Sequence, residues 1–311
     1  MLGNLLLYLA TILIWGTTWL GIVFQLGVVD PAVSLVWRFG LASLIMVAWA
    51  LARGQSLRFS LRDHAWLALQ GISLFCANYL LIYTATGLLR SGLVAVACST
   101  IVAMNIVLGA AFFGQPIRPR VAAGAGLGLV GITLVFSPEF SHLSLGDEAL
   151  RGFVFCLIGT AFASLGNLLA GRNQRTGIGV LAGSGLGMGY GALAMALFAA
   201  LSGKAFLIDL SLPYLGSLLY LAVFGSVIAF GCYLTLLGRI GADRASYCAV
   251  VYPVVALGLS TAFEGYRWSA AGAAGLALVL AGNLLILRRP GAAAPGAGSL
   301  TTSLSPRGGG R

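Results

Sequence analysis

Uncharged polar and aromatic side chains interrupt the long apolar stretches of this 311-residue sequence. Amide and hydroxyl groups can hydrogen-bond an amino or a carboxyl group without adding net charge. Aromatic rings can stack on an apolar side chain or face an ammonium group. A cavity lined by such groups would suit a small zwitterion. The candidate substrate-binding residues are Trp15, Thr18, Asn78, Tyr79, Tyr83, Ser99, Ser164, Asn167 and Tyr252.

The same residue types also have structural roles in membrane proteins. Ser, Thr and Asn hydrogen-bond one helix to another, and Tyr or Trp near helix ends form an interfacial belt. Both roles stay open for each candidate. Asn78 and Tyr79 are near the middle of their apolar stretch, and Tyr83 lies one helical turn from Tyr79 on the same face.

Arg38 is a charged residue well inside an apolar stretch. It follows Pro31 by seven residues, so a helix would place it about 10 Å below its first residue. An ionisable residue inside a membrane is costly and points to function by default. We expect a structural role, in which Arg38 bonds helix-end carbonyls or pairs with an acidic residue such as Glu264. Direct contact with substrate is the alternative.

Groups for catalysis or proton coupling are scarce. No Asp or Glu lies near the middle of an apolar stretch, and His64 and His142 lie at or outside the ends. The glycine-rich run 183–191 lacks the preceding strand and the Lys-Ser/Thr of a phosphate loop. We therefore expect no enzyme, no cofactor and no metal site. We also expect a uniporter that follows the substrate gradient, because carboxylate or histidine relays carry protons in pumps.

The elements that position these residues must be membrane helices. Hydrophobic residues make up 59% of the chain and charged residues 8%, which is too few to cover a soluble protein of this size. The net charge of +10 does not indicate nucleic acid, since the arginines are scattered singly. We predict ten spans, numbered one to ten along the chain. They lie near 4–24, 31–51, 65–87, 91–113, 120–137, 150–170, 178–201, 213–236, 244–263 and 268–287.

Loop charges predict the orientation of these spans. Basic residues gather in the links after even-numbered spans, for example Arg53, Arg120 and Arg172. The opposite links hold fewer basic residues and carry acidic ones such as Asp30 and Asp209. The positive-inside rule therefore places both termini in the cytoplasm, as expected for a multi-pass protein of the inner membrane.

The ten spans divide into two halves of five, residues 1–143 and 144–289, followed by a Gly/Ala/Pro/Ser-rich tail at 290–311 that we expect to be disordered. An offset of 150 residues aligns Cys98 with Cys248. Five crossings reverse the direction of the chain, so the second half should be inverted relative to the first. Such inverted repeats are typical of transporters in which two packings expose a central site alternately.

Several motifs together resemble the drug/metabolite transporter superfamily, EamA type. Span one contains WGTTW at residues 15–19, span two contains the pair Arg38-Phe39, and span nine contains Pro253 and ends near Glu264. The last span of each half is rich in glycine. The resemblance extends over residues 1–288. Within the family, the chain is similar to the branch of amino acid exporters that includes YddG.

This resemblance implies an all-α integral membrane carrier in which spans one, three, four, six, eight and nine surround a cavity. It implies export of aromatic or neutral amino acids, or similar small metabolites, by alternating access, with Arg38, Pro253 and Glu264 in structural or gating roles. A monomer would suffice, with the substrate and membrane lipid as partners. The alternative is a multidrug or cationic-compound exporter, which the lack of a membrane-embedded Glu disfavours.

Two positions depart from the family pattern. Ala103 stands opposite Pro253 where the family often has a second proline, and Gln115 replaces the acidic residue that often ends span four. We therefore expect the first half to be less kinked than the second.

Overall fold

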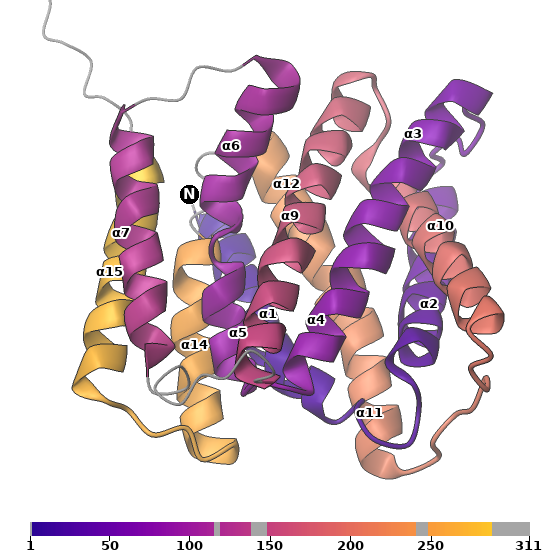
Figure 1. Cartoon of the computed structure of the whole chain (residues 1–311). Coiled ribbons are helices and arrows are strands. Elements are labelled where there is room, and N and C mark those ends of the chain that lie inside the picture. The colour runs from indigo at the N-terminus through magenta and orange to yellow at the C-terminus, as the bar shows by residue number, and fades with distance from the viewer. Residues whose placement is uncertain (1, 115–118, 138–147, 241–247, 288–311) are drawn as a thin grey trace, which may run out of the picture.

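The computed structural model describes residues 2–114, 119–137, 148–240 and 248–287, and every regular element in these ranges is a helix (Figure 1). Spans one and two are single helices, and spans three, four and eight are each built from consecutive helical segments. In chain order the elements are α1 (Leu2–Val23), α2 (Pro31–Ala52), α3 (Leu61–Gly71), η1 (Ile72–Ala77), α4 (Asn78–Thr86), α5 (Ser91–Cys98), α6 (Ile101–Phe113), α7 (Pro119–Val135), α9 (Glu148–Arg175), α10 (Val180–Leu201), α11 (Leu212–Tyr220), η2 (Leu221–Ile228), α12 (Ala229–Ile240), α14 (Cys248–Phe263) and α15 (Ala270–Leu287).

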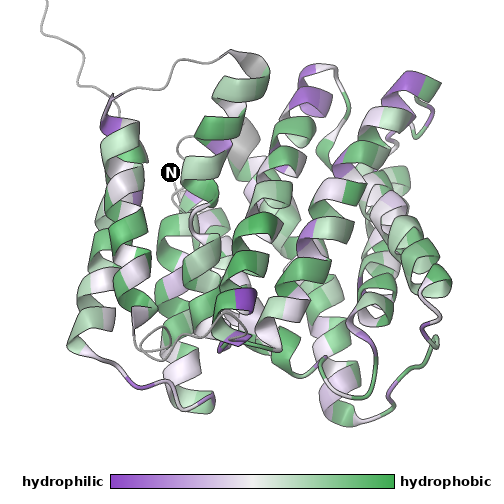
Figure 2. Cartoon of the chain, viewed as in Figure 1, coloured by the Kyte–Doolittle hydropathy of each residue, from purple (hydrophilic) through white to green (hydrophobic). Residues whose placement is uncertain are grey.

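These elements confirm the ten predicted spans. Seven of them are long and apolar enough to cross a membrane, and the described parts of spans five, nine and ten are shorter apolar helices. Many large apolar side chains are exposed on the outside of the bundle, as a lipid-facing surface requires. Figure 2 shows hydrophobic residues along most of the helices and hydrophilic ones gathered at helix ends. The half boundary at 143/144, Gln115 and the tail lie outside the described residues.

Two pairs of equivalent spans run antiparallel, which confirms that the second half is inverted. In the α2–α10 pair, Val47 lies beside Gly185 and Ser43 lies beside Gly189, and the Ser43 hydroxyl donates to the Gly185 carbonyl at 2.7 Å. The residue numbers therefore rise in opposite directions along the two helices. These helices are spans two and seven, which occupy the same position in their respective halves.

Spans five and ten repeat this arrangement at the other edge of the molecule (Figure 1). The carbonyl oxygen of Gly282 lies 2.6 Å from the point where a Cβ on Gly124 would stand, and that of Gly275 lies 2.6 Å from the corresponding point on Gly131. A side chain cannot be placed at such distances, so glycine is required for α7 and α15 to approach this closely.

Polar contacts follow the same inverted symmetry at the two ends of the bundle. At one end, the Asn173 amide of span six donates to Gln70 Oε1 of span three at 2.8 Å. At the other end, the amide of Gln25, just after span one, donates to Ser217 Oγ of span eight at 2.9 Å. Each pair therefore connects the first span of one half to the third span of the other half.

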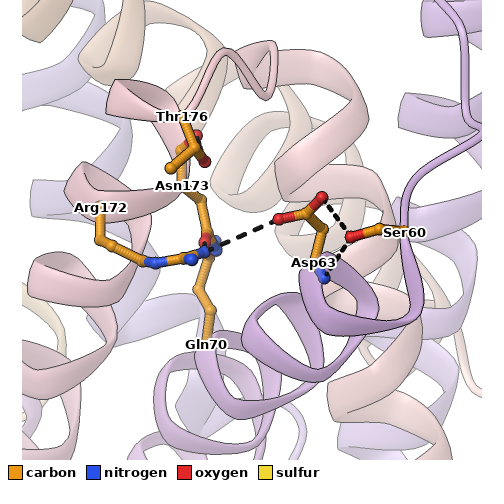
Figure 3. Close-up of polar contacts among 6 residues, drawn as sticks. All are labelled: Ser60, Asp63, Gln70, Arg172, Asn173 and Thr176. Carbon is orange, nitrogen blue, oxygen red and sulfur yellow. Dashed lines mark hydrogen bonds and ion pairs between the residues drawn. The ribbon is translucent and has the colours of Figure 1, made fainter.

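The end that carries Gln70 and Asn173 is called the basic end, because the links there contain most of the arginines. Figure 3 shows that Arg172 points towards Asp63, with 4.0 Å between the charged groups, beside the Gln70–Asn173 pair. Ser60 caps α3 by accepting from the Asp63 backbone N–H at 3.1 Å. At the opposite end, Lys204 and Asp30 form an ion pair at 2.9 Å.

Wide π-helical turns interrupt spans three and eight at equivalent positions. The first, η1, directly precedes Asn78 and Tyr79, and the second, η2, directly precedes the segment with Phe230 and Tyr233. Because π turns are frequent at functional sites, their repetition in both halves makes these four side chains candidates for a binding site.

The expectation that the first half is less kinked is wrong for span four. Helix α5 ends at Cys98 and α6 begins at Ile101, whereas α14 continues through the buried Pro253. The hydroxyl groups of Ser99 and Thr100 donate to the carbonyls of Val96 and Ala97, at 2.6 and 2.7 Å. Ser and Thr can thus satisfy carbonyls at a helix break, which allows span four to be interrupted without proline.

Candidate substrate cavity

A cavity of about 120 Å³ lies between the two halves of the bundle. It is lined by spans one, three, four, six, eight and nine, the set that the family resemblance implies. The lining side chains are all uncharged. They are Trp15, Thr18, Trp19, Ile22, Leu74, Asn78, Tyr79, Ile82, Cys98, Ile101, Val102, Asn105, Thr160, Ala163, Asn167, Phe230, Tyr233, Ala249 and Tyr252.

Aromatic side chains form much of the cavity wall and are held in defined orientations. The Trp15 indole N–H donates to the Gly225 carbonyl at 3.3 Å. Its ring centroid lies 5.2 Å from that of Phe230 and 5.1 Å from that of Tyr233. On the neighbouring wall, the rings of Trp19 and Tyr252 have centroids 6.0 Å apart. Spans one, eight and nine therefore present a pre-packed aromatic surface to a bound molecule.

The polar groups of the lining offer both hydrogen-bond donors and acceptors. Thr18 and Thr160 use their hydroxyl protons on carbonyls of their own helices, at 2.8 and 2.7 Å, so their oxygens remain as acceptors. The Asn78 amide donates to the Leu74 carbonyl at 3.2 Å. Two buried atoms of the lining, Trp19 Nε1 and Asn105 Oδ1, have no hydrogen-bond partner among the described residues. A bound molecule could satisfy this donor and this acceptor.

The structure brings together six of the nine candidate binding residues, namely Trp15, Thr18, Asn78, Tyr79, Asn167 and Tyr252. Three candidates do not line the cavity. Tyr83 is fully buried and accepts a hydrogen bond from Arg38 Nη1 at 3.2 Å. The Ser99 hydroxyl bonds its own helix, and Ser164 is packed between helices.

Six further residues of the lining were not among the candidates from the sequence: Trp19, Cys98, Asn105, Thr160, Phe230 and Tyr233. Helical periodicity could have found Thr160, because residues 160, 163 and 167 recur on one face of α9. Ser164 lies only about 40° from Thr160 around the helix, so periodicity alone would not have excluded it from the lining. The Phe230 position carries no polar group, so residue type alone does not identify it.

Arg38 is buried in the protein, with 1% of its surface exposed, and does not pair with Glu264. Its Nε donates to Ser226 Oγ and its Nη1 to the Tyr83 hydroxyl, both at 3.2 Å. Its guanidinium carbon lies 4.7 Å from the ring centroid of Tyr79. The predicted pairing with an acidic residue such as Glu264 is therefore wrong, because hydroxyl groups and an aromatic face surround the guanidinium instead.

Glu264 instead joins the end of α14 to the start of α5. Its carboxylate accepts hydrogen bonds from the Ser91 backbone N–H, at 3.1 Å, and from the Ser91 hydroxyl. The Arg90 guanidinium donates to the Glu264 backbone carbonyl at 3.4 Å. A carboxylate at a helix N-terminus satisfies free N–H groups and interacts favourably with the helix dipole.

These contacts close the cavity at the end opposite the basic end. Residues 91–99 of span four are buried at every position, whereas residues 103–108 are half-buried or exposed. At Gly92, an added Cβ would lie only 2.9 Å from Leu257 Cδ2 and Ser260 Cβ. The cavity lining extends towards the basic end as far as Asn105 and Ala249. The described conformation is therefore sealed on the Ser91 side.

Two inverted five-span halves around a central, uncharged cavity define a membrane carrier. A comparison with protein families agrees, since the profile of the EamA-like transporter family matches residues 1–137 and 150–288. The chain belongs to the EamA-like transporter family, and it is a transporter rather than an enzyme.

Similar proteins cover most of the chain. The uncharacterized inner membrane transporter YedA of Escherichia coli (strain K12) is 29% identical over 282 residues, which is 87% of this chain and 88% of YedA. Protein PagO of Salmonella typhimurium (strain LT2) is 21% identical, with 85% of this chain and 86% of PagO covered. These relationships assign the protein to the inner membrane as a multi-pass transporter.

One crystal structure of another protein has the same fold. It aligns over 91% of this chain and 95% of its own length, with a TM-score of 0.68 and 21% sequence identity.

Proposed function

We propose that this transporter exports a small zwitterionic metabolite, a neutral or aromatic amino acid, from the cytoplasm by alternating access. The observation that carries the proposal is the uncharged, aromatic-lined cavity between two inverted halves, sealed at one end. Its volume of about 120 Å³ is roughly ten times the 10–15 Å³ that one water molecule needs, which leaves room for a small metabolite.

The chemistry of the lining supports a molecule that is both polar and apolar. Asn78, Asn105, Asn167 and the two threonines can hydrogen-bond an amino and a carboxyl group, while the rings of Trp15 and Tyr252 can pack on a side chain. The placement in the amino acid exporter branch is part of the same proposal.

Loop charge supports the direction of transport. If the arginine-rich basic end faces the cytoplasm, both termini are cytoplasmic and the sealed Ser91 end faces the other side of the membrane. Export then requires that the seal around Ser91 opens while the basic end closes. The inverted halves permit this exchange, because each can adopt the packing of the other.

The absence of charged groups from the described lining supports uniport. A proton-coupled carrier uses a titratable group that also senses the substrate, and the described lining offers no carboxylate and no imidazole for that purpose. Transport would then follow the substrate gradient.

Export of an organic cation is the second candidate function. It is favoured by the six aromatic side chains of the lining, which could hold a cation by cation–π contacts. The described lining has no carboxylate to neutralise such a cation, which is why this function is the second candidate.

Transport by the purified full chain in liposomes tests the proposal. Labelled neutral and aromatic amino acids should enter saturably, with uptake accelerated by unlabelled amino acid inside and without an imposed pH gradient. Trp15→Ala should reduce this uptake, and protein-free liposomes provide the background. Flux of a labelled organic cation without any amino acid flux would favour the second candidate. Uptake that does not saturate and shows no exchange would indicate a channel.

A further inference from the structure

Arg38 is a buried positive charge without an acidic partner in the described part of the chain. A guanidinium remains charged at any physiological pH. The hydrogen bonds of Arg38 go to the hydroxyl groups of Ser226 and Tyr83. Described acidic side chains bond elsewhere: Asp30 pairs with Lys204 and Glu264 bonds Ser91. Hydroxyl dipoles stabilise this charge without cancelling it.

This charge lies directly behind the cavity wall. The guanidinium carbon is 4.7 Å from the ring centroid of Tyr79, which lines the cavity. A Cβ added to Gly225 would lie 3.4 Å from Arg38 Nη2 and 2.8 Å from Thr18 Cγ2. The distance between these two atoms is therefore no more than about 6 Å. Thr18 also lines the cavity. The wall between charge and cavity is therefore one side chain thick.

We propose that Arg38 makes the cavity selective for molecules that carry a carboxylate, and that the carboxylate lies at the wall formed by Tyr79 and Thr18. This inference rests on the proposed function and assigns its substrate class more narrowly. An uncompensated charge in a poorly polarisable interior acts over several ångströms. Arg38 thus sets specificity through space, without touching the substrate, and disfavours organic cations.

The rest of the lining fits a zwitterion held in this orientation. The Thr18 hydroxyl donates to the Trp15 carbonyl and leaves only an acceptor oxygen, which cannot hydrogen-bond a carboxylate. The attraction for a carboxylate at this wall therefore comes from Arg38 alone. The unpartnered Asn105 Oδ1 on span four provides an acceptor for an ammonium group. The expected discrimination is about 30-fold, for a charge separation of about 8 Å at an effective dielectric constant of about 20.

A matched pair of variants at Ser226 tests the proposal without removing Arg38. Ser226→Asp places a carboxylate beside Arg38 Nε and neutralises the charge, whereas Ser226→Asn has the same size and leaves the charge uncompensated. Full-length protein in liposomes is offered phenylalanine, leucine, the amides of both, and 3-phenylpropionate. Inhibition constants against labelled phenylalanine or leucine give the preference for carboxylate over amide.

The native protein and Ser226→Asn should prefer each carboxylate to its amide by about 30-fold, and Ser226→Asp should lose most of that preference. Arg38→Lys should retain it and Arg38→Gln should lose it, although the Ser226 pair decides the question if Arg38→Gln does not fold. A merely structural role would lower all affinities together and leave the ratio unchanged, which would overturn the inference. Equal binding of amides and acids by the native protein would also overturn it. Flux of none of these compounds would refute the proposed function itself, and this inference with it.

Discussion

The contact between Glu264 and Ser91 predicts that a single uncharged replacement opens the sealed end of the cavity. Glu264→Gln keeps the size of the side chain but replaces the carboxylate, which accepts hydrogen bonds from the Ser91 N–H and hydroxyl, by an uncharged amide. A hydrogen bond to a charged group contributes about 1.5–3 kcal/mol. Loss of about 2 kcal/mol from the sealed conformation would raise the population open at this end by about 30-fold.

Cys98 provides the assay, because it lines the cavity at the inner end of the buried segment of span four. In a variant that retains Cys98 and lacks the other four cysteines, a membrane-impermeant maleimide is added to either side of oriented vesicles. Labelling of the unmodified protein should be fast from the basic end and slow from the Ser91 side. Glu264→Gln should accelerate labelling from the Ser91 side by about 30-fold.

A control and a refuting result are available for this experiment. Lys204→Gln removes the ion pair with Asp30 on the same side of the membrane but away from spans four and nine, so it should leave the labelling rate unchanged. If Glu264→Gln labels at the native rate from the Ser91 side, the carboxylate contact does not hold the seal. If both variants accelerate labelling equally, the effect reflects general loosening rather than this contact.

Three further predictions concern packing, binding and coupling. Gly131→Leu should lower the free energy of unfolding by about 1–3 kcal/mol or more, because the new Cβ would collide with the Gly275 carbonyl. The control is Gly126→Ala, whose Cβ meets no atom within 4 Å. Thermal unfolding in detergent compares the two variants, and equal midpoints would contradict the packing argument. Asn167→Leu should raise the KM for the transported amino acid about fivefold by removing about 1 kcal/mol of hydrogen bonding, while Ser164→Ala should not change it, and equal effects would argue against the observed lining. An imposed pH gradient should change the initial rate of amino acid uptake by less than about twofold, and accumulation driven by that gradient would exclude uniport.

The number and direction of the spans were predictable from the sequence because the lipid environment leaves few alternatives. Backbone groups in a bilayer must be hydrogen-bonded within the segment, so each long apolar stretch must become a helix. Five crossings then force the second half to be inverted, as the contacts of Val47 with Gly185 and of Ser43 with Gly189 confirm. The residue types of the cavity lining were also evident, since uncharged polar and aromatic groups were the available chemistry.

The sequence could not decide which face of each helix turns to the cavity. In a soluble helix the apolar stripe identifies the buried face, but a membrane helix is apolar on the lipid side and in the core alike. Tyr79 and Tyr83 share a helical face and both contact Arg38, yet only Tyr79 also lines the cavity. Contacts between distant segments, such as Ser226 with Arg38 and Glu264 with Ser91, arise only when the two halves pack together, because no local pattern encodes a partner more than 170 residues away.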